Sequence, residues 1–413
     1  MKLYTTIVCF ILGLASLRAA DAPGPLAPVL QPLVDKQIAS GVVVLVADKE
    51  KVLDLETVGY ASLESKTPMR TNSLFWIASM TKTFTAAAMM MLVDEGKVKV
   101  SDPVEKYLPE FKGQMIAGND KTPEHPPKRP ITITDILTHT SGLVLANEKT
   151  LKRKYLLKEN VAEYAARPLR QEPGTKFEYN NCGINTAGRI VEVVSGMSYF
   201  DFVQRRLFDP LGLKDTTFWP TEEQASRLAR TSKRAEDKKS LEEIHHDKGL
   251  TPAWIEKFGH GIKVPTPILA DMGGGMLPDY ANRYGEPAGG LFSTAGDVGA
   301  FCRMLLNGGV YEGRRLLSEG VIKKMTSIHT GDVRVGPDVA WGLGWSVKLT
   351  DEEGPSMGSF GHRGARRTAM WVDPKNGLAM VILVERFDMT GAEQKEMYGS
   401  FMKAAIEKFG KAR

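Results

Sequence analysis

The sequence predicts a fold of the α+β or α/β class, in which an antiparallel sheet is flanked by helices and interrupted by an all-helical insertion. Three observations predict it: strand-like segments occur near the start of the chain, others occur near its end, and the long middle is rich in helices and loops. We therefore expect residues 21–100 and 288–413 to form a sheet-containing subdomain and residues 101–287 a mostly helical one. A cleft is expected where the two subdomains meet.

The N-terminal part contains a hairpin followed by a buried helix. Residues 42–47 and 51–60 are β-branched and are separated by charged turn residues, which is typical of two paired strands. Residues 79–95 are almost continuously Ala, Met, Leu, Phe and Thr and are followed by Gly96. This pattern predicts a helix that is apolar on most sides and ends at a glycine cap. Such a helix belongs in the centre of the molecule.

The middle and the end of the chain differ in pattern. Nothing between residues 102 and 287 alternates like a sheet, and the charged stretch 227–248 indicates a solvated helix or loop. Strand-like runs return at the end, the last two joined by the turn residues 374–377, and a helix closes the chain. These runs cover 341–349, 368–372 and 378–384, and the helix covers 392–409.

The first 20 residues have the layout of a secretory signal peptide. Lys2 precedes an apolar run, and small residues follow at Ala19 and Ala20, with cleavage expected after Ala19. The run is shorter than the roughly 20 residues of a membrane-spanning helix, which argues against the alternative of an uncleaved anchor. No later segment is long and apolar enough to span a bilayer. We therefore expect a periplasmic or secreted protein, with the cleavage bond left open.

Composition excludes several kinds of partner. The formal charge of +5 over 413 residues, falling to +3 once Lys2 and Arg18 are removed with the signal peptide, is spread along the chain without a basic tail, so we expect no nucleic acid partner. No metal or nucleotide motif is present, and His245 and His246 are adjacent rather than spaced to share a face. No cofactor is expected. The oligomeric state stays open.

Two cysteines remain after the signal peptide leaves with Cys9. Cys182 and Cys302 could form one disulfide, which an oxidising compartment would allow. Both lie in apolar, helix-like surroundings, where free cysteine is commonly buried. We therefore interpret them as two buried thiols.

The strongest chemical motif is Ser79-x-x-Lys82 at the start of the predicted central helix. This spacing places hydroxyl and ammonium on one helical face, and the first turn of a helix leaves backbone N–H groups free to stabilise an oxyanion. Burial suits Lys82 to act as a base. Ser400-x-x-Lys403 has the same spacing, but it lies inside the terminal helix, where an exposed pair needs no further explanation.

A second motif, Tyr179-x-Asn181, lies on a turn before a helix expected at 184–194. A tyrosine beside an ammonium can relay its proton more easily, so Tyr179 is a candidate general base for Ser79 and general acid for the leaving group. Asn181 is expected to position Lys82 and the carbonyl side of the substrate. The sequence 280–282 repeats the pattern, and in isolation either copy would more often be a surface tyrosine.

A third motif is the run His362, Arg363, Gly364 and Ala365 at a late strand. The glycine lets a substrate approach the strand edge, and the amide of Ala365 is a candidate second oxyanion donor. These four residues are predicted to bind substrate. The lookalike at 375–377 is fully explained by the hairpin turn.

Together, these three motifs resemble the class C β-lactamase and penicillin-binding serine hydrolase family, which includes esterases, D-aminopeptidases and D-Ala-D-Ala carboxypeptidases. Further stretches resemble it at 137–142, 288–294 and 341–345, so the resemblance covers roughly residues 30–405. It implies a serine β-lactamase-like fold of two subdomains, with Ser79 acylated, Lys82 and Tyr179 exchanging protons, and His362 in the place of the lysine or histidine that heads the third motif. The stretch 225–284 carries none of these motifs and is expected to border the cleft.

The chain departs from this family around the third motif. Where family members often carry threonine or serine, it has Arg363, with Arg366 and Arg367 close behind. We hypothesise that these arginines favour an anionic substrate or narrow the cleft, and the missing hydroxyl argues against efficient β-lactam hydrolysis. His139 is a candidate triad base, but its hydroxyl-rich neighbours favour a structural turn.

These observations leave several functions open. The first interpretation is a serine hydrolase that cleaves an ester or amide bond of a small-molecule or peptide substrate through an acyl-enzyme. A D-amino-acid peptidase and a β-lactamase follow. A receptor that is acylated by penicillin without turnover, and a structural exported domain, are the alternatives that are not enzymes.

Overall fold

The computed structural model of the chain describes residues 24–118, 123–144, 156–244, 284–352 and 354–411. The expected signal peptide, His245, His246 and the Tyr-x-Asn lookalike at 280–282 lie outside the described residues. Export therefore stays a prediction.

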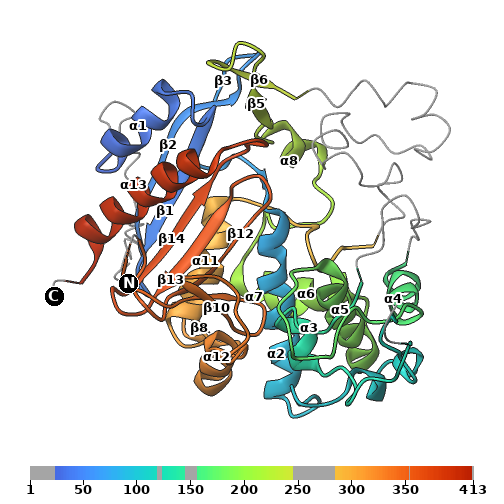
Figure 1. Cartoon of the computed structure of the whole chain (residues 1–413). Helices are drawn as coiled ribbons and strands as arrows, with labels where there is room; N and C mark the ends of the chain where they lie inside the picture. The colour runs from blue at the N-terminus through green and yellow to red at the C-terminus, as the bar shows by residue number, and fades with distance from the viewer. Residues whose placement is uncertain (1–23, 119–122, 145–155, 245–283, 353, 412–413) are drawn as a thin grey trace, which may run out of the picture.

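An antiparallel sheet of eight strands dominates the described chain (Figure 1), in the order β10-β11-β12-β13-β14-β1-β2-β3. Its strands are β1 (Gly41–Ala47), β2 (Val52–Ser62), β3 (Thr67–Pro68), β10 (Val339–Trp341), β11 (Ser346–Lys348), β12 (Phe360–Arg363), β13 (Ala369–Asp373) and β14 (Leu378–Leu383). Strand β1 pairs with β14, so the two ends of the chain share one sheet. The predicted fold class, and both predicted hairpins, are confirmed.

The central strand β1 is buried along its whole length because helices cover both faces of the sheet. Val43 and Leu45 belong to one hydrophobic cluster, and Val42 and Val44 belong to another, as expected for side chains that alternate across a sheet. Helix α11 (Ala295–Leu306) packs on the first face, whereas α1 (Ala27–Asp35) and α13 (Gly391–Phe409) cover the second. The predicted terminal helix is thereby confirmed.

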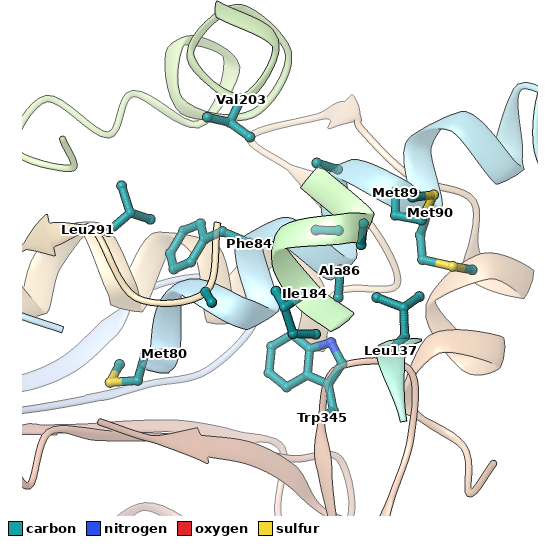
Figure 2. Close-up of a cluster of buried hydrophobic side chains, with 14 of the residues drawn as sticks. Met80, Phe84, Ala86, Met89, Met90, Leu137, Ile184, Val203, Leu291 and Trp345 are labelled. Atoms are coloured by element: carbon teal, nitrogen blue, oxygen red, sulfur yellow. The ribbon is translucent and has the colours of Figure 1, made fainter. Parts of the chain in front are cut away.

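The apolar helix predicted in the centre is α2 (Thr81–Asp94), preceded by the 3₁₀ turn η1 (Ala78–Met80). All but two of its 14 residues are buried. Figure 2 shows side chains from several elements around it, including Leu137, Ile184 and Trp345. Gly96, at φ +71°, follows the helix as expected for a glycine cap.

Most of the remaining elements are short. Between α2 and β5 (Ser232–Arg234) the chain forms α3 (Ile133–Leu137), α4 (Leu157–Ala165), α5 (Asn181–Ser195), α6 (Tyr199–Val203), the π-helical turn η4 (Gln204–Phe208) and α7 (Asp209–Leu211), of which α5 and α6 pack against α2. The chain also forms η2 (Val104–Lys106), η3 (Pro109–Phe111) and α8 (Glu222–Ser226), and α12 (Glu319–Thr326) packs against α2. Two small sheets pair β4 (Phe75–Trp76) with β7 (Phe292–Ser293) and β8 (Val310–Tyr311) with β9 (Arg314–Arg315).

The prediction for the charged stretch 227–248 was wrong in part. Its described residues include an antiparallel hairpin of β5 (Ser232–Arg234) and β6 (Leu241–Glu243), instead of only helix or loop. The carboxylate of Asp237 accepts the backbone N–H groups of Lys239 and Ser240 and so closes the turn. The strands are three residues each, too short for an alternating pattern to stand out from the charges.

The run at 341–349 was expected to be a single strand, but β10 and β11 are two antiparallel strands that flank a turn. Gly344 has φ +83° in this turn, and a Cβ there would lie 2.6 Å from the Cβ of Ala86. The glycine therefore serves both the turn and its close packing on α2.

Cys182 and Cys302 are buried and form no disulfide in the described structure, so the interpretation as two thiols is confirmed. None of the helices in the described part of the chain has the length and apolar character needed to cross a bilayer. The described residues also contain no group of three or more His, Cys, Asp or Glu side chains that could hold a metal ion.

Asp297, near the start of α11, links stability to pH. Its carboxylate accepts hydrogen bonds from the backbone N–H of Asp215 and the hydroxyl of Thr216, yet burial raises its pKa to about 6. The folded state therefore binds this proton more tightly than the unfolded chain, whose carboxyl has a pKa of 3.8. Its stabilising contribution is complete below the unfolded pKa and is lost as the pH rises through the folded one.

We expect Asp297→Asn to remove this dependence, because the amide does not titrate. Relative to the variant, the wild-type protein should gain about 1 kcal/mol in free energy of unfolding at pH 5 compared with pH 7. Urea unfolding of both proteins at the two pH values measures the difference, and all other titrating groups cancel between them. The assignment of a raised pKa to Asp297 is contradicted if the wild-type protein and the variant differ in free energy of unfolding by the same amount at both pH values. A larger advantage of the wild-type protein at pH 7 also contradicts it.

Candidate active site

Ser79 and Lys82 meet at the start of the central helix, as their spacing predicted. Lys82 Nζ lies 3.0 Å from Ser79 Oγ and donates a second hydrogen bond to the carbonyl of Ala288 at 2.6 Å. The lysine side chain is completely buried, whereas Ser79 is half-buried. The buried amine thus has two acceptors, one of which is the candidate nucleophile.

The two candidate oxyanion donors are available. In the described chain, no hydrogen bond uses the backbone N–H of Ser79 or that of Ala365. Ser79 lies in the first turn of η1, where such groups have no intrahelical partner. The turn that contains Ala365 packs against the segment entering η1, since a Cβ on Gly364 would lie 2.6 Å from the carbonyl oxygen of Ile77. Gly364 is required for this close approach.

Tyr179 lies beside the lysine at the entrance to α5. Lys82 Nζ is 4.9 Å from the centroid of its ring, and the tyrosine is 39% exposed. Within the described part of the chain, its hydroxyl forms no hydrogen bond with Ser79 or Lys82. The ring therefore faces the ammonium, while the predicted proton contact of the phenol is not formed in this state.

Asn181 was expected to position Lys82, but the two side chains form no hydrogen bond in the described structure. Asn181 is the half-buried first residue of α5. Asn185, one helical turn further on, acts through Ala288 instead. Its Oδ1 accepts the backbone N–H of Ala288 at 3.1 Å, and the carbonyl of Ala288 accepts a hydrogen bond from Lys82.

Two buried imidazoles flank Tyr179. The ring of His139 lies 4.4 Å from that of Tyr179, and the ring of His362, on β12, lies 6.2 Å from it, both measured between centroids. Trp341 packs edge-on against both histidines. Burial, together with the positive charge of Lys82, lowers the pKa of His362 to about 3 and that of His139 well below its ordinary value. Both imidazoles are therefore neutral at pH 7.

His139 occupies the structural turn that its neighbours suggested. Its φ is +58°, and its Nδ1 accepts the backbone N–H of Asn180 at 3.4 Å. Asn180 in turn caps α5 through its side chain, which accepts the N–H of Gly183. The histidine thus connects to the segment that carries Tyr179, and it forms no hydrogen bond with Ser79.

The hypothesis that the arginines after the third motif favour an anionic substrate or narrow the cleft stays a prediction, and the structure shows what two of these side chains contact. Side chains alternate along β12, so His362 faces Tyr179 while the Arg363 guanidinium lies over the ring of Tyr398 on α13, 4.4 Å from its centroid. Arg366 packs against Trp76 and Phe387. These contacts direct both guanidinium groups to aromatic surfaces of the fold.

The lookalike motifs have structural roles. Ser400 Oγ donates to the carbonyl of Met397 within α13, and Lys403 is exposed on the same helix. Asn376 Nδ2 donates to Asp373 in the hairpin turn between β13 and β14.

The segment 287–291, which carries the Ala288 carbonyl, is held by four buried side chains. The bonds join Trp76 Nε1 to the carbonyl of Gly289 (2.7 Å), Thr85 Oγ1 to the carbonyl of Pro287 (2.7 Å), Asn185 Oδ1 to the N–H of Ala288 (3.1 Å) and Thr81 Oγ1 to the N–H of Leu291 (3.1 Å). We call this arrangement the carbonyl clamp. Sequence analysis missed these side chains, although residues 288–294 were among the stretches that carried the resemblance.

Comparisons with known proteins identify relatives of this chain. The Beta-lactamase family model matches residues 26–398. An uncharacterized protein of Mycobacterium tuberculosis is 29% identical over 383 residues, which is 86% of this chain and 88% of that protein. A Salmonella agona protein named "Putative D-alanyl-D-alanine carboxypeptidase" is 30% identical over 343 residues, 76% of this chain and 70% of that one.

A solved structure shares the fold. EstCE1, described as a hydrolase with promiscuous acyltransferase activity, superposes with a TM-score of 0.71 at 21% identity, and the match covers 92% of this chain and 97% of that one.

We expect Trp76→Phe to slow acylation of Ser79 about fivefold to tenfold, because loss of one buried hydrogen bond from the carbonyl clamp is worth on the order of 1 kcal/mol. The change should loosen the Ala288 carbonyl and with it Lys82. The measurement is the second-order rate of labelling by a fluorophosphonate. Trp219→Phe is the matched control: this tryptophan packs in the same small cluster, and its buried indole N–H has no hydrogen-bond partner in the described chain. Equal rates in the two variants would refute the role of the clamp.

Proposed function

The chain belongs to the beta-lactamase family of serine hydrolases, and from this premise we propose that it is an exported enzyme that cleaves an ester or amide bond through an acyl-enzyme on Ser79. The observation that carries the proposal is the 3.0 Å contact between Ser79 Oγ and the buried amine of Lys82. Export rests on the signal-peptide layout of residues 1–20.

In the acylation step, Ser79 Oγ attacks the substrate carbonyl carbon, and its proton passes to Lys82 Nζ, which enters this step as the neutral amine and becomes the ammonium. The new C–O bond places the carbonyl oxygen at the free N–H groups of Ser79 and Ala365, which stabilise its developing negative charge. The C–O or C–N bond to the leaving group then breaks. Tyr179, partly exposed and beside the ammonium, is placed to pass a proton to the leaving atom.

Deacylation reverses these roles. Water attacks the ester carbonyl, gives its proton to the same pair of side chains, and releases Ser79 with a carboxylic acid product. The carbonyl clamp serves both acylation and deacylation, because it keeps Lys82 Nζ within reach of Ser79 Oγ.

A D-amino-acid peptidase is the second candidate, since the Salmonella agona relative carries the name of a D-alanyl-D-alanine carboxypeptidase. β-Lactam hydrolysis ranks third because the third motif lacks a small hydroxyl. A receptor that remains acylated would share the site but lack the deacylation step.

We expect a fluorophosphonate to add one equivalent of mass to the purified protein, on the peptide that contains Ser79, and we expect Ser79→Ala to abolish both the adduct and hydrolysis of a nitrophenyl ester. Intact-mass and peptide mass spectrometry measure the first effect, and release of nitrophenol measures the second. Ser400→Ala is the matched control, because it removes a serine from an identical Ser-x-x-Lys spacing, and it should keep both activities.

Labelled penicillin separates the alternatives. An adduct that disappears with turnover of nitrophenyl ester supports the hydrolase, and a permanent adduct supports a receptor. Labelling that persists in Ser79→Ala would disprove the assignment of the nucleophile. A panel of nitrophenyl esters, nitrocefin and D-alanyl-D-alanine peptides then ranks the activities, with the esters expected first.

A further inference from the structure

We infer that the site selects acyl substrates that carry an uncharged hydrogen-bond donor near the scissile bond, and discriminates against substrates that carry a carboxylate there. This inference rests on the proposed function and narrows its substrate class. It comes from the hydrogen-bonding states of the two buried histidines and the positions of the nearby arginines.

The tautomer of His362 is set by its backbone contact. Its Nδ1 lies 2.8 Å from the carbonyl oxygen of Arg363, and since a carbonyl only accepts, Nδ1 carries the hydrogen. Nε2 therefore presents a lone pair. The residue is 3% exposed, and this nitrogen has no hydrogen-bond partner in the described structure. An acceptor without a partner at this depth favours a ligand group that donates to it.

A proton on Nε2 would turn His362 into a cation that could hold a carboxylate, but the surroundings oppose it. Lys82 already brings a positive charge to the site, and His362 is buried, so a second charge nearby is disfavoured and the pKa of His362 stays at about 3. Both effects persist throughout the neutral range. The third motif therefore presents a neutral acceptor where a lysine would present a cation.

His139 is the opposite tautomer. Its Nδ1 accepts the N–H of Asn180, so its hydrogen lies on Nε2, which is also buried and unpartnered among the described residues. The ring of Tyr179 contacts both imidazoles. One imidazole offers an acceptor and the other a donor, and neither offers a charge.

The arginines after the third motif do not replace the missing cation. Arg363 lies over Tyr398, Arg366 contacts Trp76 and Phe387, and Arg367 donates to the backbone carbonyls of Phe387 and Met389. The lysine of the site is itself committed to Ser79 and Ala288.

A carboxylate beside the scissile bond would place an acceptor against the lone pair of His362 and lose its hydration without a paired donor. A carboxamide or hydroxyl of similar size can donate to the same nitrogen. β-Lactams and peptides that end in D-alanine carry such a carboxylate, so the geometry favours neutral esters and amides over both.

The test uses pairs of aryl esters that differ only by a carboxylate in place of a carboxamide: 3-carboxyphenyl and 3-carbamoylphenyl acetate for the leaving group, and the 4-nitrophenyl monoesters of glutaric acid and of glutaramic acid for the acyl group. We expect kcat/KM of the wild-type enzyme to favour the carboxamide at least tenfold in one pair or both. Equal values within threefold in both pairs, or preference for the carboxylate, overturns the inference.

Two variants locate the preference. His362→Lys should reduce the carboxamide preference at least tenfold, since it introduces a cation at the proposed acceptor, whereas Arg363→Ala should leave the ratio unchanged. A shift in the ratio on Arg363→Ala instead of His362→Lys refutes the assignment. The wild-type ratio decides the main claim even if the lysine variant fails to fold. Ester turnover with a Ser79 adduct but without the preference rejects only this inference, whereas absence of both adduct and turnover rejects the proposed function as well.

Discussion

The burial of the Lys82 ammonium is the constraint on which the rest of the site depends. An ammonium without water costs several kcal/mol unless acceptors surround it, and here the acceptors are Ser79 Oγ and the carbonyl of Ala288. That carbonyl comes from a segment more than 200 residues later in the chain. The carbonyl clamp, with Trp76 and Asn185 among its members, fixes this segment against the central helix. Stability and reactivity therefore depend on the same hydrogen bonds.

The lysine also determines the state of its neighbours. His139 and His362 are buried close enough to feel its charge, and each has one ring nitrogen engaged by the backbone. A single buried cation and two neutral imidazoles can coexist around Tyr179, whereas further protonation would add unpaired charge to a desolvated region. The site thus concentrates its positive charge at the nucleophile and leaves hydrogen-bond donors and acceptors elsewhere.

Local patterns predicted much of the fold, and long-range contacts account for what they missed. The hairpin of β1 and β2, the apolar helix α2 and the turn between β13 and β14 each follow from signals within about 20 residues of sequence. The motif around Ser79 could be found for the same reason. The role of Asn185 depends on its contact with Ala288, 103 residues away, and the direction of Arg363 depends on which face of β12 meets α13. No spacing in the sequence encodes either contact.

The two Ser-x-x-Lys motifs show how far environment, rather than residue type, determines chemistry. Both place a hydroxyl and an amine three residues apart on a helix, but Lys403 is exposed and Lys82 has no exposed surface. The ammonium at 403 is exposed to water, and Ser400 Oγ donates to the carbonyl of Met397 instead. At 82 the groups around the amine are the nucleophile itself and one fixed carbonyl, so any movement of that carbonyl alters the position of Nζ relative to Ser79 Oγ. The Ser-x-x-Lys motif alone therefore does not make an active site. The buried segment 287–291, which lies about 200 residues later in the chain, supplies the carbonyl that fixes Lys82 beside Ser79.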